Sequence, residues 1–260
     1  MKILATVLMS CALGGASVTQ ASATPEAGAT LPARDDVRAV APALERYEQG
    51  TVFGNLWRRP DLSARDRSIV TLSVLVARNQ PAELPRYLGL ALDSGVKPGE
   101  ISGLITHLAF YSGWANAMSA VTATRQVFAT RGIGADQLPA AQPELLPLDQ
   151  AAEAQRAATV ARDVRPVAPG LDQFTTDTLF QDLWLRPDLA PRDRSLVTVS
   201  ALIASGQVAQ IPFHLNRAMD NGLTRAEASE VVAHLAFYAG WPNAFSAVPV
   251  VKSVFESRTN

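Results

Sequence analysis

The second half of this chain repeats the first half without a gap. Residues 36–128 begin DVRAVAPALERYEQGTVF, residues 163–255 begin DVRPVAPGLDQFTTDTLF, and about half of the paired residues are identical. Two copies that have needed no insertion imply one fold used twice. The duplication therefore predicts two equivalent domains, at 36–128 and 163–255, joined by a linker over 129–162.

Each copy has the periodicity of helices, and no stretch shows convincing β alternation. Ser63 is placed to cap a helix with Asp66 three residues later, and Pro191 takes the first helical position in the second copy. Thr224 and Glu227 have the spacing of a capping box. We therefore predict an all-α protein with two tandem helical repeats and roughly five helices per copy.

The sequence also marks where some helices end and where one begins in the linker. Gly113 and Gly240 are expected to end a helix in each copy. The first half of the linker is rich in Gly and Pro and predicts a loop, whereas residues 149–163 predict a helix with Asp149 as its cap.

The first 23 residues have the pattern of a secretory signal peptide. Lys2 precedes an apolar run over residues 3–13, and residues 21–23, Ala-Ser-Ala, form a small-residue cleavage site. The run is shorter than the roughly 20 residues that span a bilayer. A lipoprotein signal ending at Cys11 is the alternative, with an unusually short leader. We expect a periplasmic or secreted protein without a membrane span, with a loosely attached lead-in over 24–35.

The composition excludes several classes of partner and chemistry. The net charge is -1 and Lys and Arg form no basic cluster, which argues against a nucleic-acid partner. Cys11 is the only cysteine, so the exported chain would have no disulfide, thiolate metal site or cysteine nucleophile. No two of the three histidines lie at ligand spacing beside a carboxylate in one element, so we expect no metal.

The most informative difference between the copies lies in one short helix. Residues 207–222, QVAQIPFHLNRAMDNG, and residues 80–95, QPAELPRYLGLALDSG, both predict a helix opened by proline, Pro212 or Pro85, and stopped by glycine. The side chains on this helix differ, because the second copy has Gln210 and His214 where the first has Glu83 and Tyr87.

Two long motifs, RPDLxxRDRSxVTxSxL and HLNRAMDNGLTRAEASEVVAHLAFYAGWPNA, resemble the carboxymuconolactone decarboxylase family. That all-helical family includes alkylhydroperoxidase D-like peroxidases, whose branch carries Cys-x-x-Cys followed, after three intervening residues, by His. In this chain the pattern falls on Gln207, Gln210 and His214, and in the first copy on Gln80, Glu83 and Tyr87, so only His214 matches. The resemblance therefore implies the decarboxylase branch, which acts on a small carboxylated lactone.

The same resemblance implies an assembly. Single-repeat members form rings of dimers, so one two-repeat chain is expected to stand for a dimer. We therefore expect a homo-oligomer, and a trimer of such chains is one assembly that fits.

His214 is the expected general acid/base. Loss of CO₂ beside a conjugated carbonyl leaves an enolate-like carbanion that must be protonated, and an imidazole titrates near working pH. Gln210 is expected to orient substrate or water. Glu83 could assist His214 if the matching helices share one cleft; otherwise Glu83 and Tyr87 are surface residues of a decayed site. The alternative for His214 is a partly exposed histidine at a helix start with no role.

His107 and His234 both occur in the sequence HLAFY, with Tyr111 and Tyr238 four residues later on the same helical face. These residues are expected either to form a wall of the site or to be buried, with the histidines bonded to backbone.

Arginines and tryptophans supply the remaining candidates. Arg67 and Arg194 could bind a substrate carboxylate bidentately, although Asp and Arg so close in sequence also pair with each other or cap the helix. The four tryptophans are expected to pack the core between the copies, and the two beside glycine, Trp114 and Trp241, could also line a pocket; the other two are Trp57 and Trp184.

Taken together, these patterns predict an exported, cofactor-free, decarboxylase-like lyase that acts on a small anionic lactone or keto acid. The alternatives are a hydroperoxidase or antioxidant role, disfavoured by the missing cysteines, and a non-catalytic binding or assembly protein built on an enzyme fold.

Overall fold

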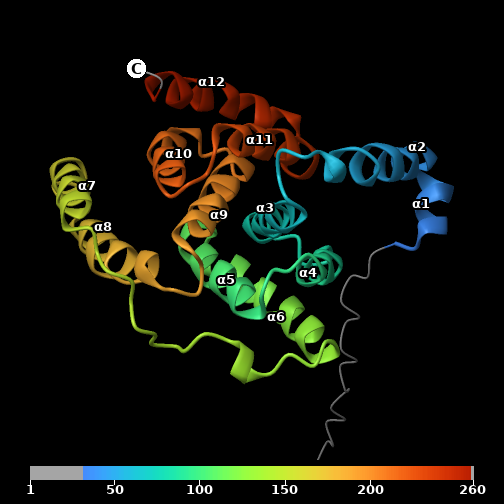
Figure 1. The fold of residues 1–260 in the computed structure, drawn as a ribbon, viewed down its shortest axis with the longest axis horizontal. Helices are drawn as coiled ribbons and strands as arrows, with labels where there is room; N and C mark the ends of the chain where they lie inside the picture. The colour runs from blue at the N-terminus through green and yellow to red at the C-terminus, as the bar shows by residue number, and fades with distance from the viewer. Residues whose placement is uncertain (1–31, 259–260) are drawn as a thin grey trace, which may run out of the picture. The chain divides into compact units, whose positions relative to one another are not determined.

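The computed structural model describes residues 32–258, and the predicted signal peptide lies outside the described residues. Residues 32–258 form twelve α-helices with short 3-10 or π turns and contain no strand (Figure 1). The predicted all-α class is therefore confirmed. No helix in this part of the chain is long and apolar enough to cross a membrane.

The first copy contains α1 (Arg34–Val40), α2 (Pro42–Tyr47), η1 (Glu48–Phe53), η2 (Leu56–Arg58), α3 (Ala64–Ala77), α4 (Leu84–Asp93), α5 (Pro98–Ser112) and α6 (Trp114–Thr130). The linker contains η3 (Ala135–Gln137) and α7 (Gln150–Asp163). The second copy contains α8 (Pro169–Phe174), η4 (Thr175–Phe180), η5 (Leu183–Leu185), α9 (Pro191–Ala204), η6 (Val208–Gln210), α10 (Ile211–Asp220), α11 (Arg225–Ala239) and α12 (Trp241–Ser257).

Most of the predicted helix ends are confirmed. The Ser63 side chain accepts a hydrogen bond from the backbone N–H of Asp66, and Thr224 and Glu227 form the reciprocal capping box. Gly113 and Gly240 have φ near +95° and +91°, a conformation that favours glycine. In α4 and α10 the proline stands one position later than predicted, because Leu84 and Ile211 begin these helices.

The two copies meet at α3 and α9, which pack against each other near the centre of Figure 1. Residues 66–76 of α3 and 193–204 of α9 are buried without exception, which places these two helices at the centre of the core. α5 of the first copy packs on α9, and α11 of the second copy packs on α3. The central helix of each copy is therefore covered in part by a helix of the other copy.

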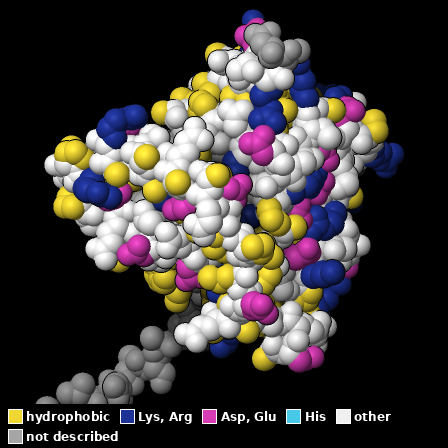
Figure 2. All heavy atoms as spheres, turned by 60° about the vertical axis from the view of Figure 1, so that its left-hand side comes forward, with side chains coloured by type: hydrophobic (Ala, Val, Ile, Leu, Met, Phe, Trp, Pro, Cys, Tyr) yellow, Lys and Arg dark blue, Asp and Glu magenta, His cyan; other side chains and the backbone are white. Residues whose placement is uncertain are grey.

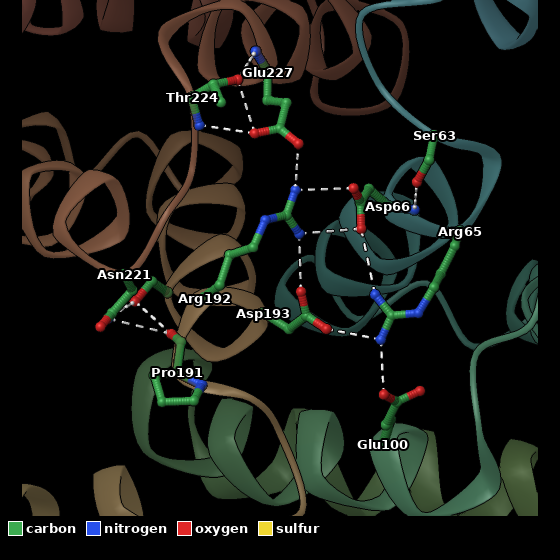
Figure 3. A network of polar contacts seen from close by, with 11 residues as sticks. Ser63, Arg65, Asp66, Glu100, Pro191, Arg192, Asp193, Asn221, Thr224 and Glu227 are labelled. Carbon is green, nitrogen blue, oxygen red and sulfur yellow. Dashed lines mark hydrogen bonds and ion pairs between the residues drawn. The ribbon is translucent and has the colours of Figure 1, made fainter.

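An ion-pair network joins the starts of the two central helices (Figure 3). Arg65 donates to Asp193 and to Glu100, at 2.7 Å each. Arg192 donates to Asp66 at 2.9 Å and to Glu227 at 2.7 Å. The first arginine of each repeated Arg-Asp-Arg-Ser motif therefore links one copy to the other.

Candidate functional site

Two equivalent aromatic clusters lie where the copies meet, and each draws side chains from both copies. The His214 cluster comprises His214 and Trp184 from the second copy with His107 and Tyr111 from the first. The Tyr87 cluster comprises Tyr87 and Trp57 from the first copy with His234 and Tyr238 from the second. This exchange follows from the packing of α5 on α9 and of α11 on α3.

In the His214 cluster, the imidazole is enclosed by aromatic rings. The His214 ring stacks on Trp184, with centroids 5.8 Å apart and planes 14° from parallel, and Tyr111 meets it edge-on at 5.3 Å. Trp184 Nε1 donates to the Tyr111 hydroxyl at 2.9 Å. His214 is only 6% exposed, so it is not the partly exposed histidine of the alternative interpretation.

His214 Nδ1 is buried and has no hydrogen-bond partner among the described residues. Burial, and then the positive charge of Arg217, lower the pKa of His214 to about 3. The imidazole is therefore neutral at pH 7 when the cluster is empty. A neutral ring with an unpaired nitrogen can accept or exchange a proton with a bound molecule.

Arg217 lies one turn after His214 on α10. Its guanidinium carbon sits 4.3 Å from the centroid of the Trp184 ring and 5.5 Å from that of Phe180. No described residue forms an ion pair or hydrogen bond with its side chain, and its Nε is buried and unbonded. Burial lowers the pKa of Arg217, while the charges of Glu153 and Asp149 act against that shift from a distance, so no described carboxylate in direct contact compensates for the lost hydration.

A second arginine reaches the same group of rings from the linker helix. Arg156 of α7 lies over Phe180 at 4.4 Å, and its Nε and one terminal nitrogen donate to Glu153 at 2.8 and 2.7 Å. Its other terminal nitrogen is buried and unbonded. The two guanidiniums near the rings of the His214 cluster thus have one directly bonded carboxylate, that of Glu153, and three buried nitrogens have unused bonding capacity. Such a group of side chains suits an anion.

Sequence reasoning missed both arginines. Arg217 carried a signal, because it lies three residues after His214 on the same helical face and Leu90 occupies the matching position in the first copy. No sequence feature pointed to Arg156, since nothing in the linker sequence indicates against which copy α7 packs.

The histidines of the two HLAFY segments are fully buried and bonded to side chains rather than to backbone. His107 Nε2 lies 2.7 Å from Thr198 Oγ1, and its Nδ1 lies 3.4 Å from an Arg194 nitrogen. Because arginine can only donate, Nδ1 accepts and Nε2 carries the hydrogen. The ring stacks on Tyr111 at 4.7 Å, so His107 supports one wall of the His214 cluster. His234 has matching contacts with Arg67 and Thr71.

Arg67 and Arg194 are both 0% exposed and already have acidic partners. Arg67 donates to Glu230 at 2.9 Å, and Arg194 donates to Asp188 at 3.2 Å. Their expected contact with a substrate carboxylate stays a prediction, and in this structure they hold His234 and His107.

The acidic partner of the buried arginine differs between the copies. Glu230 of α11 serves Arg67, and the matching position in α5 is Gly103. A Cβ on Gly103 would lie 2.9 Å from an Asp188 oxygen, so the glycine leaves room for the carboxylate that serves Arg194.

The Tyr87 cluster keeps the same architecture, with Tyr87 in the place of His214. Trp57 Nε1 donates to the Tyr238 hydroxyl at 2.8 Å, and the hydroxyls of Tyr87 and Tyr238 are 3.2 Å apart. A cavity of about 960 Å³ adjoins it and is also lined by Glu83 and Trp241.

Glu83 therefore lines the cavity beside the Tyr87 cluster, and His214 is not among the residues that line it, so the two do not share one cleft in this structure. The rings around His214 are those of Tyr111, Trp184 and Phe213.

Gln210 is exposed at the start of α10, and its expected role in orienting substrate or water stays a prediction. The expected positions of two tryptophans are corrected. Trp114 and Trp241 are 66% and 51% exposed, so they do not pack the core between the copies. Each follows the glycine that ends the preceding helix, and that abrupt end carries the ring outward. On the face drawn in Figure 2 no described histidine emerges, in keeping with the burial of all three.

Comparison with known proteins gives matches in both copies. The model of the carboxymuconolactone decarboxylase family matches residues 39–126 and 169–253. The chain is 36% identical over 83 residues to 4-carboxymuconolactone decarboxylase of Acinetobacter baylyi, covering 32% of this chain and 62% of that protein. It is 30% identical over 91 residues to nitrosuccinic acid decarboxylase of Metarhizium robertsii, covering 35% and 64%. The matched region thus spans less than two thirds of each relative.

A solved structure supports the fold. It is a Burkholderia xenovorans LB400 protein provisionally described as a gamma-carboxymuconolactone decarboxylase subunit. The TM-score is 0.52 at 18% identity, over 90% of this chain and 94% of that one. At this identity the likeness concerns the fold alone.

Proposed function

Because the chain belongs to the carboxymuconolactone decarboxylase family, we propose that it is a cofactor-free carboxy-lyase whose His214 cluster acts on a small molecule bearing a carboxylate. The two curated relatives are named for the decarboxylation of different acids, 4-carboxymuconolactone and nitrosuccinic acid. The observation that carries the proposal is the buried, unbonded Nδ1 of His214 beside the unpaired guanidinium of Arg217.

Arg217 is the proposed substrate anchor. A guanidinium that has lost water without gaining an acidic partner gains the most when a carboxylate binds it, because charge-assisted bonds then replace the missing hydration. Arg156 would contribute its free terminal nitrogen from the other side of Phe180. The pair favours a small anion with its apolar part against Trp184.

Substrate binding would also prepare His214. The charge of Arg217 is one reason why the imidazole is neutral, and a bound carboxylate offsets that charge. The proton affinity of the imidazole therefore rises on binding, and the ring takes up a proton together with the anion. Before the anion binds, the neutral ring adds no further positive charge to that of Arg217 and Arg156.

The proposed reaction needs only the substrate's own electron sink. The bond between the carboxylate carbon and its neighbour breaks, its electron pair moves into the conjugated carbonyl or nitro group, and CO₂ leaves. The imidazolium of His214 then gives its proton to the resulting carbanion, and solvent restores that proton. One proton is consumed for each CO₂ released.

CO₂ release from 4-carboxymuconolactone and from nitrosuccinate tests this function. The decisive variant is His214→Tyr, because tyrosine stands at the matching position of the first copy and suits the same surroundings. We expect its rate to fall by about 10²-fold or more, since a positioned acid/base contributes that much. Tyr87→Phe is the matched control and should keep the wild-type rate. Equal rates in wild type and His214→Tyr would overturn the proposal.

Peroxide reduction is the less favoured alternative. Cys11 is the only cysteine of the chain and belongs to the predicted leader, so residues 12–260 offer no thiolate nucleophile. A non-catalytic binding protein is separated by the same variant, because His214→Tyr would then leave ligand affinity nearly unchanged.

Export and assembly complete the proposal. The pattern of the first 23 residues supports export by a cleaved signal peptide. Large exposed side chains such as Trp114 and Phe245, at 66% and 67%, support a homo-oligomer, because solitary proteins rarely expose so many aromatic rings. N-terminal sequencing of the exported protein and light scattering of the purified protein test the two statements.

A further inference from the structure

The Tyr87 cluster borders a cavity that the proposed reaction does not use. Its volume is about 960 Å³, within the range of sites for ring-sized molecules. α1, α2 and η1 form one side, α4 forms another, and Tyr238 and Trp241 of the second copy close the wall. Apolar side chains such as Leu44, Val52 and Leu75 make up much of its lining.

The charges that line this cavity balance. Arg86 donates to Glu48 at 2.6 Å, so this guanidinium already has a counter-ion. Glu83 and the exposed Arg34 supply one further charge of each sign. The His214 cluster differs, because the two guanidiniums near its rings have one directly bonded carboxylate. An anion therefore gains little in the Tyr87 cavity.

The two tyrosine hydroxyls leave one hydrogen for a ligand. Tyr238 accepts from Trp57, and one hydroxyl hydrogen is used between Tyr87 and Tyr238. The other hydroxyl hydrogen has no acceptor among the residues that the structure describes, and both side chains line the cavity. Glu83 adds a carboxyl group that has no hydrogen-bond or ion-pair partner among the described residues, although Arg86 lies near enough to act on its charge.

We propose that this cavity is a second ligand site, which binds an uncharged, apolar ring compound carrying a hydrogen-bonding group. Tyr87 takes the place that His214 has in the other copy, so this site lacks the histidine acid/base proposed there. Duplication has thus yielded one site for an anion and one for a neutral molecule. This inference does not depend on the decarboxylase activity.

Two fluorescent probes that differ by one sulfonate test the charge preference on the full chain. N-phenyl-1-naphthylamine is neutral and apolar with one N–H donor, and 8-anilino-1-naphthalenesulfonate is its anionic relative. We expect saturable binding of one neutral probe per chain, with affinity at least about tenfold above that of the anion. Equal affinities, or several neutral probes per chain, would overturn the proposal.

Matched substitutions locate the probe. Val52→Trp fills the cavity, and Leu179→Trp makes the same change at the matching position of the second copy. We expect Val52→Trp to weaken neutral-probe binding at least about tenfold and Leu179→Trp to leave it within about twofold.

If Val52→Trp does not fold, Tyr87→Phe, which removes only the hydroxyl oxygen, tests whether the probe binds in this cavity. It should weaken binding several-fold. Equal losses in the two tryptophan variants, or wild-type binding in both Val52→Trp and Tyr87→Phe, would refute the site.

Discussion

The guanidinium of Arg217 lies 4.3 Å from the centroid of the Trp184 ring, and no described carboxylate pairs with it. The same ring stacks on His214. A cation and a neutral imidazole thus share one aromatic platform, where an anion could bind both. Arg217 marks the clearest chemical difference from the first copy, in which Leu90 takes its place.

Arg217→Leu should disable anion binding without harming the fold, since leucine is the residue of the other copy. We expect KM for the carboxylate substrate to rise at least about tenfold, because a charge-assisted bond contributes roughly 1.5–3 kcal/mol. Steady-state kinetics provide the measurement. Arg125→Gln, which removes an exposed cation from α6 of the first copy, is the control and should leave KM unchanged. An unaltered KM in Arg217→Leu would exclude it as the anchor.

The buried histidines should make stability depend on pH. His214 and His234 have pKa values lowered to about 3, chiefly by burial, whereas an unfolded histidine titrates near 6.5. The unfolded chain therefore binds these protons first as the pH falls. Their contribution to stability is fully present above pH about 6.5 and is lost toward pH 3.

His214→Tyr removes one of the histidines that take up a proton when the chain unfolds at acidic pH. Between pH 6 and pH 5, the variant should lose about 1 kcal/mol less unfolding free energy than the wild type. Urea unfolding at the two pH values gives the comparison. Parallel losses in both proteins would mean that His214 titrates normally in the folded state.

Gly103→Ala should destabilise the protein by roughly 1–3 kcal/mol, because the new methyl group would meet Asp188 at 2.9 Å and push it from Arg194. Thermal or urea unfolding measures the change. Gly170→Ala is the control, since nothing lies within 4 Å of its Cβ position. If both variants unfold alike, the glycine is not required for the carboxylate.

Arg192→Met tests the network between the copies. Its loss leaves Asp66 and Glu227 without their shared cation, and a cost of roughly 1–3 kcal/mol is expected after allowing for solvent screening at a side chain that is 23% exposed. Arg131→Met breaks an ion pair in which both side chains are well exposed, and should leave the unfolding midpoint unchanged. Equal midpoints for the two variants would contradict a stabilising role for the network.

Local chemistry explains which features could be predicted from the amino-acid sequence. The caps at Ser63 and Thr224 depend on a few neighbouring residues, so their patterns could be recognised directly. The all-α class followed in the same way from helical periodicity.

The site depended on contacts that are not local. Nothing in the sequence indicated that Tyr111 would contact Trp184 and His214 of the other copy. The same holds for Tyr238, which contacts Trp57 and Tyr87. Arg156 lies near the His214 cluster only because the linker helix α7 packs close to Phe180. Glu83 was considered as a partner for His214 because one shared cleft was considered, whereas the exchange of helices produces two separate clusters.

The charge of His214 should change when an anion binds beside Arg217. The ¹⁵N chemical shifts of its imidazole, measured at pH 7 without and with saturating succinate, report that charge. We expect a neutral ring in the free protein and a shift toward the imidazolium form with succinate, lost in Arg217→Leu. A ring that is already charged in the free protein, or one that succinate leaves neutral, would contradict the proposed uptake of a proton by His214 on anion binding.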